Sequence, residues 1–248
     1  MRAAIINSSS SKYSFAMSGC GWLSPFHFGA VEALKENQYL TNKSIVAGTS
    51  GGALAALLAC SDLHPRDGLE IIVELSKSSP FRSRINTSLR RTLSMILTEN
   101  AFQNSNGRLH IVVTKAWPKP EIKPKIISEF DSPEDMIDCI IASCFIPFYT
   151  DRLLTTTFRN EQYVDGGFLA FMPPIGNVRI SPFLHSPIIR KADISPRLLK
   201  NFKFSSPRLL PWVLKPASPD VLRYLYEAGF EAASIWCHQE SLKGKSIM

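Results

Sequence analysis

The sequence has no apolar run long enough to cross a membrane. A spanning helix needs about 20 mostly apolar residues, and the longest candidate, Ile137 to Tyr149, is interrupted by polar residues and by Pro147. Residues 1–12 carry a very short apolar patch and a serine run, so they lack the apolar core of a secretory signal. We therefore expect a flexible N-terminal segment over 1–12, no transmembrane helix and a cytoplasmic location.

The sequence also lacks paired cysteines. The chain has five cysteines, an odd number, and no Cys-x-x-Cys pair: Cys20, Cys60, Cys139, Cys144 and Cys237. This pattern argues against a disulfide framework and against a structural zinc site. Reduced thiols are expected, mostly as small buried side chains. Nothing in the sequence calls for a metal or an organic cofactor.

Acidic residues are nearly absent from the stretch 179–215. Asp193 is the only acid there, in a chain whose net charge is +7. The cations are Arg179, Arg190, Lys191, Arg197, Lys200, Lys203, Arg208 and Lys215. The apolar residues between them include Phe183, Ile188, Phe202, Leu209, Leu210 and Trp212.

This basic and apolar mixture is typical of a contact with an anionic membrane or lipid-droplet surface, where each cation contributes about 1 kcal/mol. The competing interpretation is a solvated face with core residues beneath it. No nucleic-acid motif accompanies the charge, so we expect no nucleic-acid partner. The sequence does not predict an oligomeric state.

The N-terminal half predicts two strand, glycine turn and helix units. A strand over Tyr13–Met17 leads through a glycine loop to a helix over about Pro25–Asn37. A second strand, Ser44–Ala47, leads through a second glycine turn to the small-residue helix Ala53–Cys60. With 45% apolar residues over 248 positions, the chain is long enough to bury a substantial core. The pattern predicts an α/β fold with a mainly parallel sheet flanked by helices.

The remaining elements follow from apolar spacing and from helix start signals. Helices are expected over 67–76, 88–97, 133–142 and from Ser218 onward, and strands over 108–114, 125–130 and 161–164. The helix from 133 has serine, proline and acids at its start, where they suit the unpaired N–H groups and the dipole. Residues 171–217 are rich in proline, lack periodicity and stay unassigned.

One glycine turn fits the nucleophile elbow G-x-S-x-G. It reads Gly48-Thr49-Ser50-Gly51-Gly52, between an apolar strand and a helix of small residues. Glycine two places either side of the serine removes Cβ atoms that would clash in a sharp turn, and leaves the hydroxyl exposed. By chance the pattern arises in about one chain in ten of this length. Its strand and helix context favours a nucleophile at Ser50.

The first glycine loop, Gly19-Cys20-Gly21, lies between the first strand and the first helix. Backbone N–H groups in such a loop, aided by the helix dipole, stabilise a developing oxyanion. The competing interpretation is a purely structural turn. The loop also half-matches the dinucleotide fingerprint, but Ser24 replaces its third glycine and the expected acidic residue is missing, which argues against a nucleotide cofactor.

Asp165 begins an Asp-Gly-Gly sequence at the end of a predicted strand. Such a sequence alone is most often a turn. In open α/β sheets, however, ligands gather at strand ends, where an elbow serine also emerges. Asp165 is therefore a candidate base.

In this order the three motifs resemble the patatin-like phospholipase family over Tyr13 to about Pro174. The glycine loop is most similar to the animal branch that includes adiponutrin and adipose triglyceride lipase. The stretch Ala142 to Pro147 resembles the family's Ala-Ser-x-x-x-Pro. The resemblance implies a patatin-like three-layer fold, with a catalytic domain over 13–172 and a C-terminal extension over 173–248 that holds the basic segment and a terminal helix.

The resemblance also implies site roles by position. Ser50 is the nucleophile, Asp165 the base, Gly19, Cys20 and Gly21 the oxyanion loop, and Gly48, Gly51 and Gly52 the glycines of the elbow. Ser24 departs from the family's glycine, which leaves the identity of the donors open. The implied reaction cleaves a lipid ester, as in a phospholipase A or a triacylglycerol lipase, through an acyl-enzyme.

Two alternatives remain at this point. His185 and His238 follow Asp165, so a Ser-Asp-His esterase is arithmetically possible, although neither histidine lies in a motif. The other alternative is a lipid-surface protein whose active site turns over only weakly.

Overall fold

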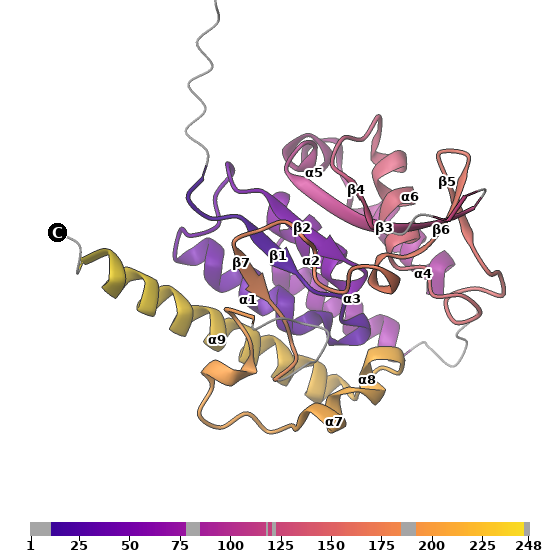
Figure 1. The fold of residues 1–248 in the computed structure, drawn as a ribbon. Helices are drawn as coiled ribbons and strands as arrows, with labels where there is room; N and C mark the ends of the chain where they lie inside the picture. The colour runs from indigo at the N-terminus through magenta and orange to yellow at the C-terminus, as the bar shows by residue number, and fades with distance from the viewer. Residues whose placement is uncertain (1–10, 78–84, 118, 121–122, 185–191, 246–248) are drawn as a thin grey trace, which may run out of the picture.

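The computed structural model describes residues 11–77, 85–117, 119–120, 123–184 and 192–245. Seven strands form one mixed sheet in the order β5-β6-β3-β2-β1-β7, with β4 also paired to β3. In Figure 1, α1, α3 and α9 gather beside the β7-β1-β2 part of the sheet, and α4, α5 and α6 beside the β3-β4-β6 part. The α/β class expected from the sequence is confirmed.

Four strands form the parallel part of the sheet: β7 (Val178–Ile180), β1 (Phe15–Met17), β2 (Val46–Thr49) and β3 (Leu109–Trp117). Every residue of β1 and β2 is buried. Central parallel strands are covered on both faces, which explains why these two read as short apolar runs without alternation. This part of the sheet places the ends of β1 and β2 side by side.

Three strands add an antiparallel edge: β4 (Lys125–Ile127), β5 (Thr156–Phe158) and β6 (Glu161–Asp165). The sequence analysis did not predict β5. Arg159 and Asn160 connect β5 to β6, with φ of 45° and 60°. A two-residue hairpin with two positive φ values usually uses Asn-Gly or Asp-Gly, so Arg-Asn gave no recognisable turn signal.

Up to residue 143, the described helices lie close to the predicted ranges, with two short additions. A 3-10 turn, η1 (Gly21–Leu23), precedes α1, and α5, which begins at the Thr98 cap, was not predicted. The larger helices of the first 143 residues are α1 (Ser24–Glu36), α2 (Gly51–Cys60), α3 (Pro65–Lys77), α4 (Ile85–Ile96), α5 (Glu99–Ser105) and α6 (Pro133–Ser143).

The second glycine turn is tighter than expected. The strand continues to Thr49, not Ala47, and the helix begins at Gly51, not Ala53. A single residue, Ser50, therefore connects β2 to α2. So tight a turn is possible because Gly48 has no Cβ. A Cβ there would lie only 2.3 Å from the Gly52 carbonyl oxygen, so the two backbones are in contact.

The unassigned stretch 171–217 contains β7 and several short helical turns. These turns are η4 (Pro196–Leu198), α7 (Ser206–Leu209) and α8 (Pro211–Leu214). A further 3-10 turn, η3 (Gly166–Phe168), lies just before the stretch. Three-residue strands and four-residue helices are too short to show periodicity, so hydrophobic patterning could not reveal these elements.

The terminal helix α9 (Pro219–Lys245) packs along α1. Figure 1 shows the two helices side by side over the parallel part of the sheet. Two glycines allow the approach, since a Cβ on Gly29 would lie 1.9 Å from the Tyr226 oxygen and one on Gly229 would lie 1.9 Å from the Phe26 oxygen. Residues beyond 173 thus supply a strand of the sheet and a helix of the core.

Candidate active site

Ser50 occupies a strained turn between β2 and α2. Its φ of 53° and ψ of −126° are rare for a residue with a side chain. The turn is tightly packed, because a Cβ on Gly51 would lie 2.7 Å from the Gly21 oxygen and one on Gly52 would lie 2.4 Å from the Met17 oxygen. Ser50 itself is 8% exposed, at the N-terminus of a buried helix whose dipole favours negative charge nearby.

Asp165 ends β6 and lies beside the elbow. Thr49 pairs with Val112 of β3, and Asp165 pairs with the next residue, Val113, from the other side. The structure therefore brings Ser50 and Asp165 together across one strand. Because β6 runs antiparallel to β3, Asp165 reaches this position from the opposite direction to the parallel strands β1 and β2, a direction that the sequence analysis did not predict.

The carboxyl of Asp165 is buried and only half satisfied. Its Oδ1 accepts a hydrogen bond from the Gly167 N–H at 2.7 Å, while its buried Oδ2 has no hydrogen-bond partner in the described part of the chain. Burial raises the pKa of Asp165 to about 6, although the nearby Ser50 hydroxyl and the Gly167 N–H lower it. Oδ2 is thus a free acceptor close to Ser50, and contacts of this kind are often loose before substrate binds.

Ser143 fixes the elbow from the end of α6. Its hydroxyl accepts a hydrogen bond from the Ser50 N–H at 2.9 Å and donates one to the Val112 oxygen at 2.7 Å. The Asp165 N–H donates to the Phe145 oxygen at 2.7 Å. The Ala-Ser-x-x-x-Pro stretch therefore holds both Ser50 and Asp165, a role that the sequence analysis did not assign to it.

The glycine loop lies next to the elbow, and its N–H groups are not equivalent. The Gly19 N–H donates to the Phe171 oxygen at 2.7 Å. Within the described residues no hydrogen bond is found from the N–H of Cys20 or Gly21. The nitrogen of Gly21 lies 3.1 Å from the position of a Cβ on Gly51. Of the three expected donors, Cys20 and Gly21 are thus the two whose N–H groups are available to bind an oxyanion.

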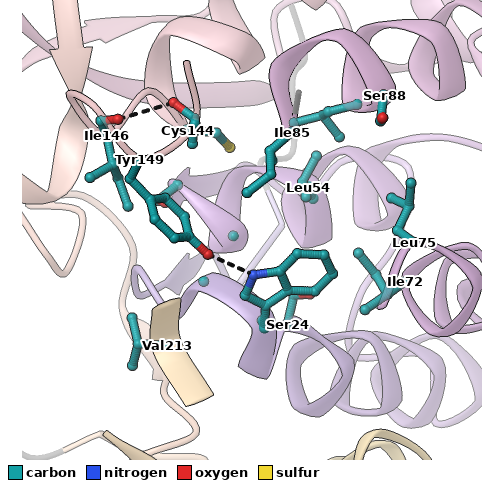
Figure 2. A pocket seen from close by; sticks show the side chains of 16 residues that line it. Ser24, Leu54, Ile72, Leu75, Ile85, Ser88, Cys144, Ile146, Tyr149 and Val213 are labelled. Carbon is teal, nitrogen blue, oxygen red and sulfur yellow. Dashed lines mark hydrogen bonds between the residues drawn. The ribbon is translucent and has the colours of Figure 1, made fainter. Parts of the chain in front are cut away.

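A cavity of about 330 Å³ opens beside Ser50, a size within the range of ligand pockets. Figure 2 shows Val213 and Tyr149 on one side of it, and Ile72 and Leu75 on the other. The lining is mostly apolar: Gly21, Trp22, Ser24, Ser50, Gly51, Leu54, Ile72, Leu75, Ile85, Ser88, Leu89, Cys144, Ile146, Tyr149, Thr150 and Val213. Such a cavity suits an acyl chain whose carbonyl lies at Ser50.

The described histidines do not complete a triad. None of His27, His64, His110 and His238 is among the residues that line the cavity. His238 is exposed, and its neighbour Cys237 accepts a hydrogen bond from Tyr39, beside Tyr13. Tyr13 precedes β1, whereas the glycine loop follows β1, so His238 lies at the wrong end of that strand. His185 lies outside the described residues.

Burial keeps the cysteine thiols near the site protonated. It raises the pKa of Cys20 and of Cys144, and the nearby Asp165 raises both further. In the part of the chain that the structure describes, no group of three or more His, Cys, Asp or Glu side chains is arranged to hold a metal ion. Among the same residues, no helix has the length and apolar character needed to cross a membrane.

Comparison with known proteins places the chain in a family. The profile of the patatin-like phospholipase family matches residues 15–176. Omega-hydroxyceramide transacylase from Homo sapiens is 32% identical over 172 residues, which cover 65% of this chain and 31% of that protein. The 1-acylglycerol-3-phosphate O-acyltransferase Pnpla3 from Mus musculus is 30% identical, covering 69% of this chain and 44% of that protein.

A third relative, patatin-like phospholipase domain-containing protein 2 from Mus musculus, is 27% identical over 240 residues, which cover 88% of this chain and 49% of that protein. The chain thus spans less than half the length of these three relatives. They confirm the resemblance to the animal branch that includes adiponutrin and adipose triglyceride lipase. The profile match covers most of the chain, from β1 to the turn before β7, and the protein therefore belongs to the patatin-like phospholipase family.

Proposed function

We propose that this protein is a lipid acyl hydrolase that cleaves carboxylic esters through Ser50 and Asp165. The observation that carries the proposal is the juxtaposition, across β3, of a strained elbow serine and a buried aspartate with one free oxygen, beside an apolar cavity. No described histidine lines that cavity, which favours a dyad over a Ser-Asp-His triad.

The proposed reaction has two halves. Asp165 accepts the proton of the Ser50 hydroxyl as Ser50 Oγ attacks the ester carbonyl, and the N–H groups of Cys20 and Gly21 stabilise the oxyanion. The alcohol leaves with the proton from Asp165, and an acyl-enzyme remains on Ser50. Water, deprotonated by Asp165, then attacks the acyl carbonyl, and the fatty acid leaves as Ser50 recovers its proton.

The raised pKa of Asp165 makes it a better base than an exposed aspartate. A base works best when its pKa is near the working pH, and burial moves this one from 3.8 to about 6. The same burial removes water from around the oxyanion, where backbone donors then act more strongly. Both effects support a single carboxylate as the only base.

A panel of phospholipid, triacylglycerol and simple aryl esters tests the proposal. Turnover is expected for the parent protein and a loss of at least about 100-fold for Ser50→Ala and for Asp165→Asn, with the double mutant no worse, because the two groups act as a unit. A fluorophosphonate is expected to label Ser50 alone. Two relatives are named for acyl transfer, so an alcohol acceptor is included to measure transfer against hydrolysis.

Two results would contradict the assignment. Full turnover by Asp165→Asn, or loss of turnover in His185→Ala or His238→Ala, would favour the triad. A folded parent that leaves every ester uncut would favour the weakly active lipid-surface protein.

We also propose that the protein contacts a membrane or lipid droplet at the mouth of the cavity. In the basic segment 179–215, five of the six described cations are exposed and Arg179 is half-buried; the exposed ones are Arg197, Lys200, Lys203, Arg208 and Lys215. Several of its apolar side chains are not free to insert, because Leu209 is buried and Phe202 and Trp212 pack against the core. This supports a headgroup contact by the cations more than insertion by those three residues.

Other apolar side chains near the cavity are available for insertion. Phe148 is 72% exposed and has a positive φ of 58°, a strained conformation for an aromatic residue. Leu210 and Leu214 are also exposed, beside Val213 of the cavity. The Tyr149 hydroxyl donates a hydrogen bond to the Leu214 oxygen, so these two segments are joined. Apolar insertion and cations together give firmer attachment than either alone.

Flotation with anionic vesicles separates the two contributions. Lys200, Lys203, Arg208 and Lys215 changed together to Gln are expected to weaken binding strongly at low salt. Phe148→Ser with Leu214→Ser is expected to weaken it at all salt concentrations, because apolar insertion is not screened. Glu231→Gln, an exposed change on α9, serves as the control. Unchanged binding by both variants, each folded, would exclude this surface.

A further inference from the structure

His27 is a buried histidine that hydrogen-bonds to the backbone at the start of the glycine loop. It lies on α1, is fully buried, and its Nε2 is 3.0 Å from the Ser18 oxygen. Its Nδ1 is buried and finds no hydrogen-bond partner among the residues that the structure describes. Burial lowers the pKa of His27 to about 4, so the ring is neutral above that pH. Because a carbonyl oxygen accepts, the proton of the neutral ring lies on Nε2.

The Ser18 carbonyl belongs to the peptide that starts the glycine loop. The N–H of that same peptide, from Gly19, donates to the Phe171 oxygen at 2.7 Å. The preceding N–H, from Ser18, donates to the Ile180 oxygen at 3.1 Å. The Ser18–Gly19 peptide is therefore held at both ends, by His27 from α1 and by Phe171 from the opposite side. This peptide directly precedes the peptides that carry the Cys20 and Gly21 N–H groups, so its orientation constrains where the loop starts.

The same carbonyl also contacts α2, the helix that follows Ser50. A Cβ on Gly52 would lie 2.5 Å from the Ser18 oxygen. His27 thus bonds an atom that lies between the glycine loop and the first turn of α2, whose N-terminal neighbour is Ser50. A shift of this carbonyl would move the proposed donors relative to the proposed nucleophile.

Packing alone does not explain why a histidine occupies this buried position, because one of its ring nitrogens is left without a hydrogen bond. A buried nitrogen without a hydrogen-bond partner destabilises the folded state, whereas an apolar side chain of similar size has no such penalty. Native proteins keep few such groups, and each calls for an explanation. Here the Nε2–H bond to the loop offsets the unpartnered Nδ1.

We propose that His27 is a positioning residue that holds the Ser18–Gly19 peptide and thereby aims the Cys20 and Gly21 N–H groups at the oxyanion. The inference rests on the proposed hydrolase function, because it assigns His27 to the same reaction. His27 touches neither the substrate nor Ser50, and it transfers no proton.

Two substitutions separate positioning from packing. His27→Leu removes the donor and keeps an apolar side chain of similar size, whereas His27→Gln places an amide N–H at a similar reach. The matched control is His110→Leu, because His110 is a partly buried histidine of β3 whose Nδ1 lies 3.2 Å from the Arg108 oxygen. Ester turnover, KM, thermal unfolding and fluorophosphonate labelling of Ser50 are measured for each variant.

His27→Leu is expected to lower kcat by about 10- to 100-fold with KM within about twofold, since a small misplacement of catalytic groups costs about that much. His27→Gln is expected to recover most of the loss, and His110→Leu to keep the parent kcat. In the parent, ¹⁵N NMR of the imidazole is expected to show His27 protonated on Nε2 and not on Nδ1 from pH 5.5 to 8.

The outcomes distinguish this inference from the function on which it rests. A parent that neither cleaves esters nor reacts with the fluorophosphonate overturns the proposed function, and this inference with it. A parent that is active while His27→Leu retains its kcat overturns the inference alone. So does a neutral His27 whose proton lies on Nδ1, or a His27→Gln variant that is as impaired as His27→Leu while equally stable.

Discussion

At the scale of single residues, the raised pKa of Asp165 predicts how turnover and stability change with pH. Burial raises its pKa from 3.8 to about 6, so the ionised form is disfavoured in the folded state. If Asp165 is the base, kcat/KM is expected to rise with pH through about 6 and then level off, since the base must be ionised. A rate profile over pH 4.5–8.5 measures this midpoint. A midpoint near 4, the value of an exposed aspartate, would contradict the assignment.

The same pKa predicts a change in stability. A group whose pKa is raised on folding contributes stability that is complete below its unfolded pKa and is lost as pH rises through about 6. Asp165→Asn removes this loss, while its side-chain oxygen still accepts from Gly167. We expect the variant to be more stable than the parent at pH 7.5 by up to about 3 kcal/mol, and by much less at pH 4.5. Urea unfolding at both pH values checks this, and an equal difference at both would exclude it.

Gly21 combines a tightly packed backbone position with the proposed role of an oxyanion donor. Its φ is +53°, and a Cβ there would lie 1.9 Å from the Val213 oxygen of α8. Gly21→Ala is therefore expected to lose about 2 kcal/mol or more of stability as well as turnover. For Gly19→Ala the nearest atom is a Phe171 side-chain carbon at 3.2 Å, so a smaller loss of stability is expected. Thermal unfolding of both variants compares them, and equal melting temperatures would contradict this view.

At the scale of elements, the contact between α1 and α9 depends on two glycines. Glycine is normally the poorer choice inside a helix, and alanine is favoured there by about 1 kcal/mol. Gly229→Ala should nevertheless destabilise the protein, because its Cβ would meet the Phe26 backbone at 1.9 Å and push the helices apart. We expect a net loss of about 2 kcal/mol or more.

The exposed substitution Glu231→Ala, two residues further along the same helix, is the matched control and is expected to change stability by less than about 0.5 kcal/mol. Denaturant unfolding compares the two variants. A Gly229→Ala variant as stable as the parent would show that α9 is free to move away from α1.

At the scale of the whole molecule, the C-terminal residues are needed for the sheet and the core. The family profile ends at residue 176, before β7 pairs with β1 and before α9 covers α1. Buried Glu32 of α1 also accepts hydrogen bonds from Tyr226 of α9 at 2.8 Å and from Arg66 of α3 at 3.2 Å. Ending the chain at 176 would expose an edge of the sheet and the α1 surface, and would leave this carboxylate without one partner.

We therefore expect a chain of residues 1–176 to be insoluble or unfolded, and a chain of residues 1–245 to fold. Circular dichroism and size-exclusion chromatography of the two proteins test this. A soluble, cooperatively unfolding 1–176 chain would establish that the extension is a separate unit.

The sequence alone predicted the α/β class, the two glycine turns and the elements around them. These features depend on local chemistry: small residues where backbones touch, an apolar run before each turn, and a cap with acids at the start of α6. The resemblance to the family also named Ser50 and Asp165 by position, and the structure places them on either side of β3. Their roles stay a proposal until the dyad is tested.

Other features were decided by tertiary structure, because they depend on partners distant in the chain. The direction of β6 is set by its antiparallel pairing with β3, more than 40 positions earlier. The Gly19 N–H donates to the Phe171 carbonyl oxygen, and the Ser50 N–H donates to the Ser143 hydroxyl, 93 positions away. Likewise, burial of Leu209 comes from packing that no periodicity in a four-residue helix reveals. Local chemistry thus determined where the chain turns, while long-range packing decided which backbone donors remain free.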